Sequence, residues 1–214
     1  MRVKLDKYAV YSKAKKREYE ILIFPAEENM WAYDDFPEMD MLLVDGNKDA
    51  YKALKLAYGI LAQFPEIIIY FPIRKVTGEK GAFWNSHDLV LMRPELQFRR
   101  SEWYLLKEKL DKKHLERRFV FDYDRKKLQD YFYKRKVCWD YEKWRKKAEQ
   151  KYLEEIVGDT LFMVVPKLIC YENHNAICEM MDSYKAGAWN PDSCYRVGWL
   201  FSDYQLKEIV KNMS

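Results

Sequence analysis

Glycine, proline and cysteine are scarce in this chain. Seven glycines and seven prolines among 214 residues argue against a loop-rich or repetitive protein, because these residues mark turns and linkers. Four irregularly spaced cysteines do not suit a secreted disulfide framework, so we expect reduced, mostly buried thiols. No run of about 18 apolar residues could span a bilayer, and residues 1–7 lack the apolar middle of a signal peptide. We therefore expect a cytoplasmic protein with no membrane partner.

The sequence also lacks the short motifs that mark common enzymes. It has no Gly-x-Ser-x-Gly elbow, P-loop or Gly-x-Gly-x-x-Gly, which removes the commonest hydrolase, nucleotidase and dinucleotide-binding interpretations. The histidines His87, His114 and His174 are scattered. Ser86, His87 and Asp88 adjoin, but neighbouring side chains on a strand point to opposite faces and cannot form a triad. We expect no cofactor, and enzymatic activity is not the favoured interpretation.

Apolar residues are plentiful enough for a sizeable core. The chain is 49% hydrophobic and 16% aromatic, so it needs no metal or disulfide to fold. Strand-like and helix-like segments are mixed without strict alternation, which predicts an α+β fold with a small sheet of about six or seven strands. No Ser/Gly-rich linker divides the chain, so we expect one domain over residues 1–214. Any division would fall near residues 95–120, where the helical half begins.

The N-terminal half is predicted to consist mainly of strands. Residues 67–71 form a continuous apolar run, typical of a strand covered on both faces. A helix is expected after Asn47, whose side chain can cap it. Residues 27–40 show no clean period and are predicted to form a loop. The expected strands are residues 7–12 and 19–24, paired as a hairpin, then 41–44, 67–71 and 83–92.

Helices are expected to dominate the C-terminal half. Ser101 is predicted to cap one helix, and Ser202 begins a capping box that predicts a C-terminal helix to about residue 211. Residues 124–156 contain no glycine or proline, which indicates one long basic helix or a helix pair. The expected strands are residues 118–122 and 161–165, the latter being the last.

Charge is distributed unevenly. The formal net charge is only +4, yet residues 26–49 carry eight acids against one base, and residues 117–151 carry 13 bases against six acids. The two blocks either face each other in the fold or each face a partner, and both interpretations remain open.

The basic block is the main functional signal. Clustered bases suit contacts with phosphate, and nearby Tyr and Trp suit stacking on nucleobases. On one continuous helix, Lys127, Lys134 and Arg145 would lie within about 20° of one line and form a stripe. The alternative is a solvated amphipathic helix whose aromatic residues all belong to the core. The candidate nucleic-acid-binding residues are Lys126, Lys127, Lys134, Arg135, Lys143, Arg145, Lys146 and Lys147.

The same block conflicts with a single helix. Arg135 and Lys146 would fall among apolar side chains such as Phe132 and Trp139. This predicts a break near residues 138–142, or long side chains that extend past the core.

Asp122 and Asp124 form the candidate catalytic pair. Residues two apart on a strand share one face, so both carboxylates could reach one metal ion, as in a metal-dependent nuclease. The favoured alternative is that Asp124 caps the next helix and Asp122 is a solvated strand end.

The spacing of Cys170, His174 and Cys178 resembles that of metal ligands. On a helix, however, the two cysteines lie about 12 Å apart along the axis, and zinc bonds of about 2.3 Å cannot reach both. We therefore predict no metal site here.

Trp31, Tyr33 and Phe36 lie among acids within residues 27–40. If exposed, they would form a binding surface for a basic protein. The alternative is a lid over the core, and it is favoured.

These signals favour a non-enzymatic binding protein that engages a nucleic acid or a nucleoprotein. The alternatives are a metal-dependent nuclease that uses Asp122 and Asp124, and a structural or assembly protein whose charge blocks pair within an oligomer. The Lys-, Tyr- and Trp-rich, Gly-poor composition resembles that of small phage or mobile-element proteins, including inhibitors of host defence.

Overall fold

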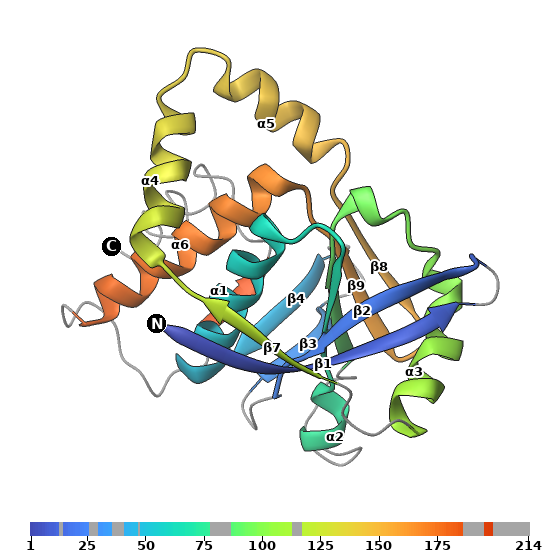
Figure 1. Cartoon of the computed structure of the whole chain (residues 1–214). Coiled ribbons are helices and arrows are strands. Elements are labelled where there is room, and N and C mark those ends of the chain that lie inside the picture. Colours follow the sequence, from blue (N-terminus) through green and yellow to red (C-terminus); the bar gives the residue numbers. More distant parts are fainter. Residues whose placement is uncertain are drawn as a thin grey trace.

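Two β-sheets and the helices around them make up the fold (Figure 1). The computed structural model describes residues 1–12, 15–25, 30–35, 41–46, 48–77, 87–112, 117–185 and 195–198. The larger sheet has seven strands in the order β7-β1-β2-β5-β6-β9-β8. These strands are β1 (Arg2–Ser12), β2 (Arg17–Ile23), β5 (Ile67–Phe71), β6 (Asp88–Met92), β7 (Arg117–Asp122), β8 (Leu153–Val157) and β9 (Thr160–Val164).

The larger sheet is mixed in direction. β1 and β2 form the expected antiparallel hairpin, while β2 pairs with β5, and β6 with β9, in parallel. β5 is the central strand and all five of its residues are buried, which confirms the sequence-based expectation. Strands from both sides of residues 95–120 share this one sheet.

The smaller sheet corrects one expectation. Residues 27–40 were expected to be a loop, but Met30–Asp35 forms strand β3, which pairs antiparallel with β4 (Met41–Gly46). Met30 and Ala32 are both fully buried, as alternate residues of a strand are. A methionine and a small alanine at the inward positions give a weak sequence signal. β10 (Tyr195–Gly198), also unexpected, pairs with β4.

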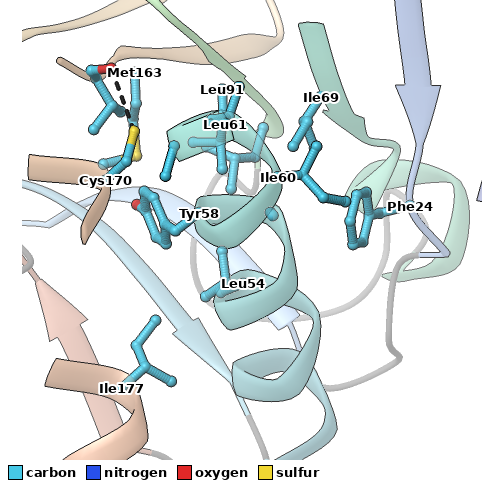
Figure 2. Packing of buried hydrophobic residues seen from close by; sticks show 14 of the residues in the cluster. Phe24, Leu54, Tyr58, Ile60, Leu61, Ile69, Leu91, Met163, Cys170 and Ile177 are labelled. Carbon is cyan, nitrogen blue, oxygen red and sulfur yellow. Dashed lines mark hydrogen bonds between the residues drawn. The ribbon is translucent and has the colours of Figure 1, made fainter. Parts of the chain in front are cut away.

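Helices α1 (Lys48–Gln63) and α6 (Lys167–Lys185) pack side by side on one face of the larger sheet (Figure 1). Leu54, Tyr58 and Leu61 recur at helical spacing on α1 and are buried, as expected. Figure 2 shows α1 between Phe24 and Ile69 on one side and α6 on the other. This interface forms the larger of two hydrophobic clusters.

The opposite face of the sheet is covered by α3 (Trp103–Lys112). Trp103 makes edge contacts with Tyr70 and Phe162, at ring-centroid distances of 5.1 and 5.9 Å. Ser101 does not cap this helix as expected, because it lies inside a 3₁₀ turn, Arg100–Glu102, that leads into α3. A short helix, α2 (Ile73–Thr77), follows β5.

The basic block forms two helices, which is one of the two outcomes that the conflict in its pattern predicted. α4 (Arg125–Lys136) and α5 (Tyr141–Glu149) are separated by residues 137–140. The helical expectation was wrong for residues 153–156, which belong to strand β8. α6 was also missing from the expected order, because Asn173, His174 and Asn175 interrupt its apolar pattern although all three are buried.

The α+β class and the sheet of about seven strands are confirmed. The helix expected from Ser202 lies outside the described residues. Among the helices that the structure describes, none combines the length and apolarity needed to cross a bilayer.

Candidate nucleic-acid interface

The basic helix α4 is fixed at its start and along one side. The carboxylate of Asp124 accepts a hydrogen bond from the backbone amide of Lys127 at 3.0 Å, so it caps the helix as expected. Leu128 and Phe132, one turn apart, are buried in the larger core cluster. α4 and α5 both pack against α6. The opposite sides of both helices therefore face solvent.

A column of stacked groups joins α6, α4 and α5. The ring of Tyr131 stacks on that of Tyr171 in α6, with centroids 4.4 Å apart and planes 26° apart. The guanidinium carbon of Arg135 lies 5.3 Å from the ring centroids of both Tyr131 and Trp144. Arg135 thus bridges α4 and α5 through cation–π contacts. Its guanidinium lies against aromatic rings, so its position among apolar side chains is compatible with its charge.

Six exposed lysines lie on the outward sides of α4 and α5. None of them forms an ion pair with an acid in the described part of the chain. No ion pair with a described carboxylate therefore holds their ammonium groups, which stay available to an anionic partner. We call them the outer lysines: Lys126, Lys127, Lys134, Lys143, Lys146 and Lys147.

Three outer lysines line a shallow hollow of about 380 Å³ on α4. Its walls are formed by Asp124, Lys126, Lys127, Asp130, Tyr131 and Lys134. Asp124 and Asp130 are the two acids of the lining, against three lysines. The hollow is open and positively charged on balance, which suits a phosphate group.

Arg145 does not extend the stripe that one continuous helix would have formed. Its guanidinium is ion-paired with Glu149 at 2.9 Å and with Glu172 at 3.3 Å, and its side chain is only 21% exposed. α4 ends at Lys136, so the angular relation between Lys134 and Arg145 that a single helix predicts does not apply. Among the predicted binding residues, Arg145 is held by ion pairs and Arg135 by cation–π contacts, and the other six are the outer lysines.

Trp139 also departs from its expected place. It was expected on the apolar side of a long helix, but it lies in the turn between α4 and α5 and is 91% exposed. The break at residues 137–140 changes the phase of the helix, so positions before and after it no longer share one face.

The candidate catalytic pair, Asp122 and Asp124, is committed to local contacts. Asp122 ends β7 and its carboxylate pairs with Arg2 at 3.0 Å, which lowers the pKa of Asp122. Asp124 caps α4. No group of three or more His, Cys, Asp or Glu side chains within the described ranges is placed to hold a metal ion.

The Cys170, His174 and Cys178 segment is helical, so the two cysteines lie on separate turns of α6. The Cys170 thiol donates to the carbonyl of Val165, whereas His174 Nε2 lies 2.8 Å from the Tyr123 hydroxyl and 3.9 Å from Cys178 Sγ. Burial raises the pKa of the Cys170 thiol to about 12 and also raises that of Cys178. Both thiols are therefore protonated and poorly nucleophilic at neutral pH.

A charged cluster beside β6 could not be found from the sequence. Asp88 is buried, and its carboxylate accepts from Tyr70 Oη at 2.8 Å and Lys107 Nζ at 2.7 Å. Lys107 also donates to Asp159, which pairs with Arg74 at 2.9 Å. Burial alone would lower the pKa of Lys107, but its bonds to Asp159 and Asp88 raise it. Each charge in this cluster is paired with another, and the pairs join α2, β6 and α3 to the β8–β9 turn. The cluster therefore stabilises the fold.

The predicted protein-partner residues can be placed only in part. Trp31 and Tyr33 lie on β3, while their side chains, and the whole of Phe36, are outside the described residues.

Comparisons of the chain with protein-family models, with curated proteins and with solved structures found no match. Its function is therefore inferred from the outer lysines and their surroundings alone.

Proposed function

We propose that the outer lysines of α4 and α5 bind the phosphate backbone of a nucleic acid, free or within a nucleoprotein. The observation that supports this most is that all six are exposed and form no ion pair with the described acids. A surface evolved only for solubility intersperses both signs of charge. Lysines that form no ion pair with an acid suit an anionic partner, whose counterions are released on binding.

The spacing along α4 suits a nucleic-acid strand. Lys127 and Lys134 are seven residues apart, which places them about 10 Å apart along the helix axis. That is about three steps of a strand that rises about 3.4 Å per nucleotide. Lysine is a flexible point charge that reads no base sequence in such contacts. We therefore expect binding that tolerates changes of sequence.

Charge reversal on α4 tests this proposal. The variant Lys126→Glu, Lys127→Glu, Lys134→Glu removes three outer lysines that line the hollow. We expect it to abolish binding of labelled DNA and RNA in a fluorescence anisotropy titration at low salt. The fold should persist, because all three side chains are exposed.

A matched control separates local contacts from overall charge. Lys4→Glu, Lys16→Glu, Arg99→Glu changes three other exposed bases, and lowers the net charge of +4 by the same amount. The control should retain most of the affinity. Equal losses in both variants would mean that net charge, and not the surface of α4 and α5, accounts for the binding.

A phage or mobile-element origin, with a role against host defence, stays a prediction from composition. A nucleoprotein of the host would then be the target of this surface.

A further inference from the structure

The turn between α4 and α5 exposes two apolar side chains at the periphery of the molecule (Figure 1). Trp139 is 91% exposed and Val137 is 83% exposed. Tyr131 and Trp144 of the same hairpin are used in the column that holds it on α6, and the Tyr133 hydroxyl donates to Glu179. Trp139 is therefore the aromatic residue of this hairpin whose ring is most available to a partner.

The turn holds Trp139 on an ordered backbone. The amide of Val137 donates to the carbonyl of Tyr133 at 3.2 Å, and that of Cys138 donates to Arg135 at 3.1 Å. The amide of Tyr141 donates to the carbonyl of Cys138 at 3.0 Å, which closes the turn on its far side. A ring presented from such a backbone loses little conformational freedom when it is covered.

Positive charge surrounds the turn on both sides. Lys134 precedes Trp139 by five residues and Lys143 follows it by four, while Asp140 and Glu142 partly offset them. Over residues 134–147 there are seven bases and two acids. An anionic partner with a flat apolar face complements a tryptophan in this setting, and a nucleic acid with unpaired bases has both properties.

We infer that Trp139 stacks on an unpaired nucleobase while the outer lysines hold the adjoining phosphates, so that the surface prefers single strands to duplexes. This inference rests on the proposed function. In a duplex the faces of the bases are already stacked on one another, so Trp139 finds no partner there without distorting the helix. Phosphate contacts, in contrast, are available in both forms.

An anionic lipid surface is the competing partner, and a vesicle-binding measurement separates it from a nucleic acid. Lys126 and Lys127 lie in the first turn of α4, whereas residues 137–140 follow its last turn. They are therefore about 15 Å or more from the turn along the helix axis. A strand lying along α4 would contact both these lysines and the turn.

The test compares a labelled oligothymidylate with a duplex of the same length, using Trp139→Ala and Trp139→Phe. We expect Trp139→Ala to weaken binding of the oligothymidylate about tenfold, because a stacked aromatic side chain contributes about that much. The affinity for the duplex should not change, and Trp139→Phe should restore most of the loss. Tyr104→Ala is the matched control, since Tyr104 is 70% exposed on α3, across the sheet from α4 and α5.

The outcomes separate this inference from the proposal beneath it. If the unaltered protein binds neither nucleic acid at low salt, the proposed function fails and the inference fails with it. If it binds both equally and Trp139→Ala behaves like the unaltered protein, only the inference fails. Binding to phosphatidylserine vesicles that depends on Trp139, without a matching effect on the oligothymidylate, would also overturn it.

Discussion

A histidine buried in α6 shows how one residue can make the fold sensitive to pH. His174 is fully buried beneath α1, where its ring contacts Tyr123. Burial, together with the nearby charges of Lys55 and Arg125, lowers the pKa of His174 to about 4. The ring is therefore neutral in the folded protein at neutral pH. Gly59 packs beside it: a Cβ there would lie 3.5 Å from the ring, an ordinary contact, and 3.1 Å from Leu128 Cδ1, a tight one.

We predict that the free energy of unfolding falls as the pH is lowered from about 6.5 to about 4. In this window the unfolded chain binds a proton at His174, whose ordinary pKa is 6.5, while the folded protein does not. The neutral His174 ring contributes about 3 kcal/mol to the free energy of unfolding above pH 6.5, and this contribution is lost as the pH falls towards 4. Urea unfolding across this range measures it. His174→Gln should flatten the dependence; an equally steep dependence in this variant would contradict the assignment.

At the scale of elements, α4, the turn at residues 137–140 and α5 form a helical hairpin. Arg135 packs the two helices together, and the outer lysines give the hairpin its positive surface. Arg135 lies between the rings of Tyr131 and Trp144, so it couples the two helices. Lys134, its neighbour, is exposed and forms no ion pair with the described acids. Adjacent bases in one sequence run thus have different roles.

We therefore predict opposite outcomes for two neighbouring substitutions. Arg135→Ala should lower the free energy of unfolding by about 1–2 kcal/mol, because it removes two cation–π contacts, and should speed hydrogen exchange in α5. Lys134→Ala should leave stability unchanged and weaken nucleic-acid binding. Thermal unfolding and anisotropy on the same two proteins measure both effects. A Lys134→Ala protein as destabilised as Arg135→Ala would show that the roles are not divided in this way.

The elements that could be predicted from the sequence are those with an uninterrupted pattern. Residues 67–71 are all apolar and form the central strand. The clash of Arg135 and Lys146 with apolar positions predicted either a break in the basic block or long side chains that extend past the core, and the block breaks at residues 137–140. α6 could not be found, because three buried polar residues break its periodicity. β3 was hidden because its inward positions carry Met30 and Ala32 among acids and aromatic residues.

The sequence predicted the segment that forms the candidate site but not which of its side chains are available to a partner. Clustered bases identified the segment, but the sequence did not reveal that Arg145 would pair with Glu172, 27 positions along the chain. The exposure of Trp139 depends on where α4 ends, and a helix end without glycine or proline leaves little trace in sequence. Contacts between distant residues decide which of the bases remain available.

For the whole molecule, α4 and α5 form a basic outer layer on α6, while the two sheets and α1 provide the apolar core (Figure 1). The formal net charge is only +4, so a strong attraction to nucleic acid would have to come from this local surface rather than from the total charge. This is the central claim, and the dependence of affinity on salt tests it most directly.

The decisive measurement is the affinity for a labelled duplex across a salt series. If all six outer lysines contact phosphates, the logarithm of the association constant should fall with the logarithm of salt concentration with a slope of about −5. Each outer lysine replaced by alanine should make the slope shallower by about 1. A slope that Lys127→Ala and Lys134→Ala leave unchanged, or no binding even at low salt, would contradict the assignment of this surface to nucleic acid.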